Sequence, residues 1–406
     1  MAFPHRPRGD EPEEILILNE ITRQFIRENL NADVPTLALK KAPVGTDVSL
    51  ALRQIEARQL LQKKVPEWST NEELLFPVHL SIEQCSSEAT AKYKAKLLKG
   101  NTFSDLTGGL GIDSYYLSQK FSKSDYVERQ TELCDLARHN FSVLNAPIQV
   151  WNETSEEYIN HCEPRDCIYI DPARRDLYGR KTVSIADCTP NVVELQDLLL
   201  QKAKTVMVKL SPMLDISKAL AELHCVKEVH VVATANECKE LVFILERGFS
   251  GQTELCCVNL QTDQPVVRFT QAEENDCPLK LADTVGNYLY EPNVALLKAG
   301  CFKLLCERYG VIKLHKNSHL YTSNTLVSVF PGRIFSVEAW ADYNKKVKNG
   351  LLADVEKANL AVRNFPLSVE ELRKTLKIND GGNIYLFATT LKGERKVLVK
   401  TKKSAS

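Results

Sequence analysis

Apolar residues near the N-terminus recur at the spacing of a helix. One stripe contains Leu18, Ile21, Phe25 and Ile26, and a second, after Thr46-Asp47, contains Leu52, Ile55 and Leu60. Residues 1–14 are rich in proline and charge, as a loose leader is. A further helix over Glu88 to Leu98 follows Ser86-Ser87, whose hydroxyls can cap it. The pattern predicts a helical N-terminal region over residues 1–97.

Short apolar runs of strand length follow, and each ends on polar residues. They are Phe103-Ser104-Asp105, Tyr126-Val127-Glu128, Val150-Trp151-Asn152 and Tyr169-Ile170-Asp171, separated by stretches long enough for helices. Alternating strands and helices indicate a parallel sheet. The polar residues are therefore expected at one edge of that sheet, where α/β proteins bind ligands.

A glycine-rich turn connects the first of these strands to a helix. It reads Asp105-Leu106-Thr107-Gly108-Gly109-Leu110-Gly111-Ile112-Asp113. Glycines allow backbone N–H groups to approach a ligand, and the start of a helix favours an anionic group. Glu128 lies about twenty residues beyond the turn, at the ribose-hydroxyl position of a nucleotide-binding unit. The two features predict a nucleoside or dinucleotide site.

With Asp171-Pro172-Ala173-Arg174, these residues resemble the motifs of class I S-adenosylmethionine-dependent methyltransferases. The whole chain resembles the bacterial THUMP-like-domain methyltransferases, which implies S-adenosyl-L-methionine as cofactor and modification of RNA, either tRNA or rRNA. The resemblance implies that Asp105 and the amides near Gly109 and Gly111 hold the amino acid end of the cofactor, and that Glu128 holds its ribose. Thr107, Gly108 and Asp113 complete this set. Thr154 is the best-aligned adenine contact, with Asn152 as the alternative. Ser86 and Ser87 either reach the methionine end or cap a helix.

The order of the later strands distinguishes two fold classes. The run Lys227 to Ala233 and the run Leu241 to Leu245 are separated by a link too short for a crossover helix, so this pair is expected to be antiparallel. A parallel sheet closed by one antiparallel strand is the class I methyltransferase arrangement and argues against the all-parallel dinucleotide fold. The predicted fold is α/β with a seven-stranded Rossmann-like core over residues 98–250.

Beyond the core, the pattern predicts two smaller modules. Residues 251–330 contain β-hairpins and a helix over Asn293 to Tyr309, and form a small ferredoxin-like linking module. Residues 331–406 contain strands, a helix over Asp342 to Asn349, and a helix opened by the capping box at Ser368. This α+β pattern is similar to a THUMP-like domain.

Composition narrows the class of protein. The chain has 406 residues, more than one hydrophobic core usually holds, and 52 basic residues balance 52 acidic ones, so any basic surface must be local. The 12 cysteines contain no C-x-x-C pair, which gives no metal site and favours reduced, buried thiols. With no secretory leader and no apolar run of membrane-spanning length, a cytoplasmic protein is expected. The oligomeric state leaves no signal in the sequence.

Asp171, Pro172 and Arg174 are the predicted catalytic residues. A carboxylate at position 171 can accept a hydrogen bond from a nitrogen and direct its lone pair at the methyl group, while Pro172 stiffens the turn. RNA uridine C5-methyltransferases share a similar motif but carry a cysteine after the next strand, where this chain has Lys209-Leu210-Ser211-Pro212. Methylation of a base nitrogen or a ribose oxygen is therefore favoured. A protein methyltransferase and a non-catalytic RNA-binding scaffold are the alternatives.

Two basic segments are candidate RNA contacts. Arg174, Arg175, Arg180 and Lys181 can clamp phosphates beside the site or form a solvated loop. The segment from Lys392 to Lys403 has six basic residues against the single Glu394. It can bind RNA or protect a sheet edge from pairing.

Overall fold

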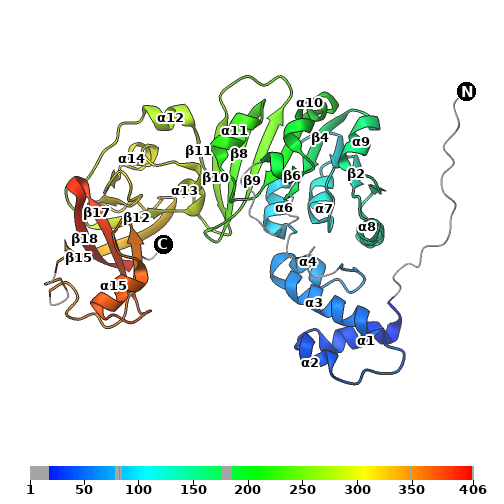
Figure 1. Cartoon of the computed structure of the whole chain (residues 1–406), viewed down its shortest axis with the longest axis horizontal. Helices are drawn as coiled ribbons and strands as arrows, with labels where there is room; N and C mark the ends of the chain where they lie inside the picture. Colours follow the sequence, from blue (N-terminus) through cyan, green and yellow to red (C-terminus); the bar gives the residue numbers. More distant parts are fainter. Residues whose placement is uncertain are drawn as a thin grey trace, which may run out of the picture. The chain divides into compact units, whose positions relative to one another are not determined.

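The computed structural model describes residues 18–77, 82, 85–174, 185–344, 346–347 and 350–404 (Figure 1). The chain divides into two compact units. The first contains residues 1–173 and 194–206, and the second contains residues 174–193 and 207–406. Within the described part of the chain, none of the helices combines the length and the apolar character that crossing a membrane requires.

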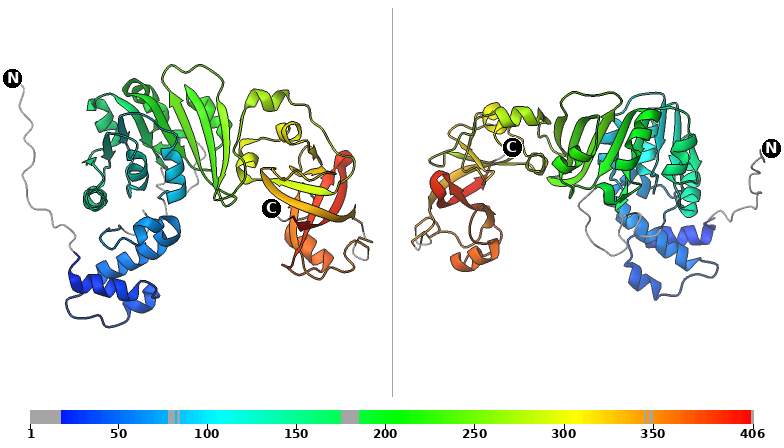
Figure 2. Two further views of the ribbon diagram at one scale, coloured as in Figure 1. Left: turned by 180° about the vertical axis from the view of Figure 1, so that it is seen from behind. Right: turned by 45° about the horizontal axis from the view of Figure 1, so that its top comes forward.

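The first unit begins with the predicted helical region. Its helices are α1 (Glu20–Asn29), α2 (Val34–Ala38), α3 (Val48–Lys64) and α4 (Pro66–Ser69). Asn19, Asp33 and Asp47 cap the first three with side-chain oxygens. Helix α1 packs along α3, as both views show (Figure 2). Phe25 and Ile26 are buried as expected, whereas Ile21 is 47% exposed, so its place in the predicted stripe is wrong.

Parallel strands form the half of the core that carries the glycine-rich turn. After α6 (Glu88–Ala95) come β1 (Thr102–Asp105), α7 (Ile112–Ser118), β2 (Lys123–Val127), α8 (Thr131–Val143), β3 (Ile148–Trp151), α9 (Ser155–His161) and β4 (Arg165–Ile170). Strand β1 pairs in parallel with β2 and β4, and β2 pairs with β3. Asp105 stands opposite Tyr126 on one side and Tyr169 on the other. The carboxyl ends of these strands therefore meet at one edge.

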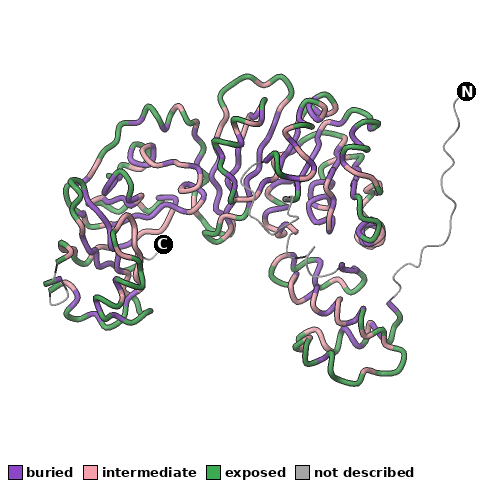
Figure 3. Tube along the Cα trace, in the orientation of Figure 1, coloured by how far each residue is buried: buried purple, intermediate pink, exposed green. Residues whose placement is uncertain are grey.

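The sheet takes the order β11-β10-β8-β9-β7-β4-β1-β2-β3. Its other elements are α10 (Val192–Lys202), β7 (Ala203–Leu210), α11 (Ile216–Glu222), β8 (Val226–Thr234), β9 (Glu237–Glu246), β10 (Glu254–Leu260) and β11 (Val267–Thr270). Strand β9 is antiparallel to β8, as the short link predicts. The sheet has nine strands because β10, with its hairpin partner β11, adds to β8. Its middle strands are purple in the burial view (Figure 3).

A seven-stranded sheet forms the end of the chain, in the order β13-β14-β12-β15-β18-β17-β16. Its strands are β12 (Tyr288–Pro292), β13 (Ile312–Lys313), β14 (Tyr321–Ser323), β15 (Gly332–Asp342), β16 (Asn359–Arg363), β17 (Ile384–Leu391) and β18 (Arg395–Lys403). Helix α15 (Val369–Leu376) begins at the predicted capping box, with Ser368 and Glu371 bonded reciprocally.

The remaining elements of the chain are short. They are α12 (Gln271–Asp276), α13 (Val294–Ala299), α14 (Leu304–Tyr309), β5 (Ala173–Arg174), β6 (Cys188–Thr189), and the 3₁₀ turns η1 (Ile185–Asp187) and η2 (Lys392–Glu394).

Two predicted helices differ in the structure. The helix expected over Asn293 to Tyr309 is split into α13 and α14, because Gly300 has a positive φ of 77° and caps the first of them. The helix expected over Asp342 to Asn349 is wrong: β15 extends through Asp342, and the described residues that follow lie in turns.

Candidate active site

Gly108 and Gly111 fit the turn after β1 for two different reasons. A Cβ atom on Gly108 would lie 2.1 Å from the ring of Tyr126. Only glycine at position 108 therefore lets the Tyr126 ring, which comes from β2, pack beneath the turn. Gly111 has a φ of 84°, and a Cβ there would lie 2.9 Å from the ring of Phe141. Both glycines shape the turn against the protein core.

Gly109 connects the turn to the end of β2. Its N–H donates to Oε2 of Glu128 at 3.1 Å, and its carbonyl accepts from the hydroxyl of Tyr126 at 2.6 Å. Oε1 of Glu128 accepts from the N–H of Gln130 at 2.9 Å. Two carboxylate oxygens have about four acceptor positions, so Glu128 retains capacity for further donors. The turn and the predicted ribose residue are therefore brought together.

Asp105 is fully buried at the base of the turn. Its Oδ1 accepts from the N–H of Thr107 at 2.9 Å, and its Oδ2 accepts from the hydroxyl of Ser114 at 2.5 Å. Burial raises the pKa of Asp105 to about 7, because the charged form is desolvated, and the nearby Asp113 and Asp171 add to the rise. The observed contacts of Asp105 hold the turn to α7. The direct contact to a ligand expected of it stays a prediction.

Asp171 is joined to the turn through its backbone. Its N–H donates to the hydroxyl of Thr107 at 2.7 Å, which links the end of β4 to the end of β1. Asp171 is half-buried and Pro172 is buried. Arg174 lies in β5, but its side chain is outside the described structure, as are Arg175, Arg180 and Lys181. Their predicted contacts stay predictions.

Lys94, which the sequence does not single out, is buried against Asp113 at the start of α7. The Nζ atom of Lys94 is 3.0 Å from Oδ1 of Asp113 and 2.9 Å from the hydroxyl of Ser86. Oδ2 of Asp113 accepts from Ser86 at 2.7 Å and from the hydroxyl of Tyr169 at 2.6 Å. Ser87, not Ser86, caps α6. Helical spacing could have predicted the burial of Lys94, since Lys94 lies three residues after Ala91 on the same buried face of α6.

Asn152 and Thr154 have local partners in the structure. The amide of Asn152 donates to the carbonyl of Glu128 at 3.0 Å and accepts from the hydroxyl of Thr131 at 2.9 Å. Thr154 caps α9 in a capping box with Glu157. These contacts fix the loop after β3 beside Glu128. The adenine contact assigned to either residue stays a prediction.

The basic segment at the end of the chain is paired with acids. Arg395 contacts Asp342 at 2.6 Å, Lys400 contacts Asp354 at 2.7 Å, and Lys402 pairs with Glu338. Lys396 lies 3.5 Å from Glu394. Strand β18 lies between β15 and β17, so the edge-protection interpretation of this segment is wrong.

Three comparisons with known proteins bear on the family. A model described as a ferredoxin-like domain matches residues 288–331, and one described as THUMP domain-like matches residues 332–403. A crystal structure from Porphyromonas gingivalis W83, assigned as a methyltransferase, is 36% identical to this chain. That alignment covers 95% of this chain and 98% of the other, with a TM-score of 0.85. The comparison with curated proteins gave no match.

Other solved structures align with only part of the chain. An rRNA methylase from Streptococcus thermophilus is 14% identical, covering 39% of this chain and 93% of its own, with a TM-score of 0.29. TrmK of M. capricolum, in complex with S-adenosyl-homocysteine, is 11% identical, covering 43% and 71%, with a TM-score of 0.31. TM-scores this low support no inference about this chain.

Proposed function

The chain belongs to the THUMP-like family of class I S-adenosylmethionine-dependent methyltransferases, and on this premise we propose that it methylates RNA at a base nitrogen or a ribose oxygen. tRNA and rRNA are both candidate substrates. The proposal includes a cytoplasmic location and the division of the chain near residues 97, 250 and 330. The main support for methyl transfer is that three strand ends meet: the glycine-rich turn after β1 contacts the side chain of Glu128 after β2 and the backbone of Asp171 after β4.

The residues at these strand ends fit S-adenosyl-L-methionine. Among the described residues, and apart from its chain neighbours, the nearest heavy atom to a Cβ built on Gly109 is the carbonyl oxygen of Thr107, at 3.9 Å, so these residues leave room for a ligand at this part of the turn. Glu128 is ordered by two backbone N–H groups and keeps acceptor capacity for ribose hydroxyls. The cofactor would be held by the turn at its amino acid end and by Glu128 at its ribose. When bound, it supplies an electrophilic methyl group on a sulfonium.

The residues of the chain then have to orient the acceptor. Asp171 is half-buried and its backbone N–H is bonded to Thr107, which holds this residue beside the turn. A carboxylate there accepts a hydrogen bond from the target N–H or O–H and directs the lone pair of that atom at the methyl group. Positioning alone supplies much of the rate in such a transfer. Arg174 would bind a flanking phosphate.

A covalent cysteine mechanism is disfavoured by the sequence after β7. Ser211 stands in the segment where the resembled C5-methyltransferases carry their nucleophilic thiol. The twelve cysteines are thiols and not disulfides, and where the pKa of a thiol shifts, it is raised by burial, as for Cys167, to about 11. A raised pKa lowers the thiolate fraction and the nucleophilicity.

The test is a comparison of modified nucleosides in RNA from a deletion strain and from its parent. We expect one methylated nucleoside to disappear from tRNA or rRNA and to return when the purified protein is added with labelled cofactor. Asp171→Ala should lower turnover of bound RNA and leave RNA affinity nearly unchanged, because it acts at the reacting atom. Label incorporated into protein but never into RNA would favour a protein methyltransferase. RNA binding without transfer would favour the non-catalytic scaffold.

A further inference from the structure

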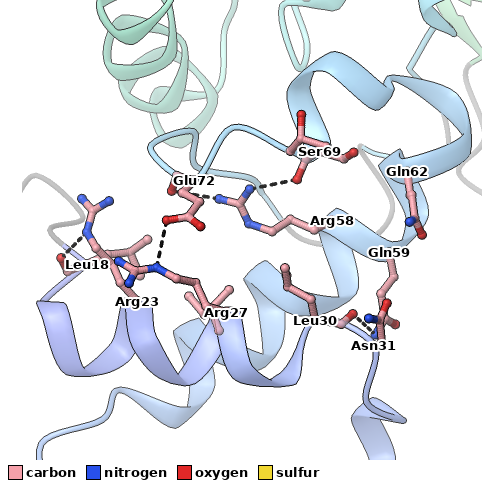
Figure 4. A pocket seen from close by; sticks show the side chains of 12 residues that line it. Leu18, Arg23, Arg27, Leu30, Asn31, Arg58, Gln59, Gln62, Ser69 and Glu72 are labelled. Carbon is pink, nitrogen blue, oxygen red and sulfur yellow. Dashed lines mark hydrogen bonds and ion pairs between the residues drawn. The ribbon is translucent and has the colours of Figure 1, made fainter.

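A cavity lies in the N-terminal helical region, among α1, α3 and the loop after α4. Its volume is about 310 Å³, and its wall includes three arginines, Arg23, Arg27 and Arg58 (Figure 4). Glu72 is the acidic residue of the same wall. Two more glutamates, Glu73 and Glu20, pair with Arg23 and Arg27 from outside the lining, so the three arginines face three carboxylates. Three guanidinium groups gathered in one wall favour an anionic ligand that can displace these carboxylates.

Arg58 is a fixed, buried cation in this wall. It is only 5% exposed, and its two terminal nitrogens donate to the carbonyls of Ser69, Asn71, Glu72 and Leu74. Among the described residues, its Nε finds no hydrogen-bond partner. Burial lowers the pKa of Arg58 to about 10, because desolvation disfavours its charged form and the nearby charge of Glu72 offsets this only in part. An anion bound near this guanidinium would stabilise its charged form further.

The other two arginines are held by exchangeable partners. Arg27 contacts Glu72 at 2.8 Å and Glu20 at 3.0 Å, and Arg23 contacts Glu73 at 2.7 Å. All three glutamates are more than half exposed, so these ion pairs are surface pairs of low stability. A phosphate can replace the carboxylates, since guanidinium groups bind it in the same bidentate geometry.

The remaining wall has the two kinds of surface that a nucleobase requires. Leu18, Ile26 and Leu30 are the apolar residues of the lining. Gln59 donates its amide to the carbonyls of Leu30 and Ala32, at 2.8 Å each, which fixes the end of α1 beside the cavity. Gln62, also in the wall, presents an exposed amide. Apolar faces with amide edges bind flat heterocycles, and the arginines add a phosphate site.

We propose that this cavity binds one phosphate-bearing nucleotide, either free or as a unit of an RNA chain. The RNA source rests on the proposed function, whereas nucleotide binding itself does not. The site is separate from the glycine-rich turn and involves none of the residues assigned to the cofactor or to the acceptor. It would give the helical region a role in holding substrate at a distance from the reacting atom.

The experiment titrates the full-length protein with each 5′-mononucleotide, with inorganic phosphate, and with RNA oligonucleotides. The test variant is Arg23→Gln/Arg27→Gln, which leaves the Arg58 clamp intact. The matched control is Arg53→Gln, which removes a partly exposed arginine of α3 that contacts Glu132 at 3.5 Å. We expect mononucleotide affinity to fall at least tenfold in the test variant and to stay unchanged in the control. S-adenosylmethionine affinity should be the same in all three proteins.

Each outcome identifies the source of the nucleotide or contradicts the nucleotide site. If mononucleotides compete with RNA and the test variant weakens both, the RNA chain is the source. If mononucleotides bind but do not compete with RNA, the free nucleotide is the source. Inorganic phosphate binding as tightly as a mononucleotide, or mononucleotide affinity equal in test variant and parent, would overturn the proposal. Cofactor binding without any RNA methylation would contradict the proposed function but not the nucleotide site, because mononucleotide binding is measured separately.

Discussion

The glycine-rich turn after β1 and the basic strand β18 are both short, conspicuous stretches of sequence, yet they behave differently in the structure. In the turn, Gly109 and Glu128 meet as their spacing predicts. In β18, Arg395 and Lys400 look like a cationic surface in the sequence but are paired with Asp342 and Asp354. A glycine turn is set by local backbone geometry, whereas the charge of a strand depends on what its neighbours in the sheet carry.

The two regions show which kinds of sequence signal predict a structure by themselves. Backbone conformation and steric fit act within a few residues, so a glycine that needs a positive φ is informative by itself. Charge acts through space over about 10 Å at ordinary salt. Glu338 lies on β15, far from Lys402 in the sequence, and neutralises it across the sheet.

The largest effect is expected from Gly108→Ala. The new Cβ would lie 2.1 Å from the Tyr126 ring, so the turn or β2 must shift, which should lower the free energy of unfolding by roughly 3 kcal/mol and abolish cofactor binding. The matched control is Gly393→Ala in the turn before β18, where φ is 75° and a Cβ has no heavy atom within 4 Å among the described residues. There only backbone strain of about 1–2 kcal/mol applies. Urea unfolding and calorimetry measure both.

A Gly108→Ala protein that binds cofactor normally would show that the turn adapts and that its steric fit is not specific. Gly111→Val should disturb the core as well as the site. A Cβ atom at this position would lie 2.9 Å from the ring of Phe141.

Asp105→Asn should alter how stability depends on pH. The pKa of Asp105 is raised to about 7 in the folded protein, so the folded state binds more protons than the unfolded state between about pH 4 and 7. Stability of the parent therefore falls as pH rises through that window, by up to about 1.4 kcal/mol per pH unit for one proton. Asparagine does not titrate, so the variant should lose this contribution to the slope. Equal slopes in denaturation series from pH 4 to 8 would contradict the assigned pKa.

Glu128→Gln should weaken cofactor binding by ~1.5–3 kcal/mol, the range for losing charge-assisted hydrogen bonds. Glutamine keeps one oxygen for the N–H of Gly109 or of Gln130 but not both, so part of the loss will come from the turn itself. Glu156→Gln, an exposed glutamate on α9, is the control and should bind cofactor as the parent does. Isothermal calorimetry separates the two; equal affinities would remove Glu128 from the site.

Much of the first unit, and the β8–β9 pair of the second, could be predicted from the sequence because the signals are local. The strand ends at Asp105, Glu128 and Asp171 follow from short apolar runs, and the antiparallel β8–β9 pair follows from a link too short for a helix. What could not be predicted depends on contacts between distant residues. Lys94 contacts Asp113 only because α6 packs on α7, and Asp342 lies in a strand because β15 pairs with β18 up to this residue.

The smallest effect is expected where the sequence predicted a large one. If Arg395, Lys396, Lys400 and Lys402 each contacted an RNA phosphate, neutralising all four would reduce the slope of log affinity against log salt by about 3. Each of these cations already lies near a carboxylate, and Lys400 is only 8% exposed, so few counterions are released there on binding. We therefore expect a slope change below about 1 in filter-binding titrations of the quadruple glutamine variant.

A second variant removes the acidic partners in place of the cations. Glu338→Gln with Asp342→Asn and Asp354→Asn would free Lys402, Arg395 and Lys400, and RNA affinity at low salt should rise. If the quadruple variant instead loses the full slope, β18 binds phosphates by exchanging its carboxylate partners, and charge clusters in this sequence would be as informative as its glycines.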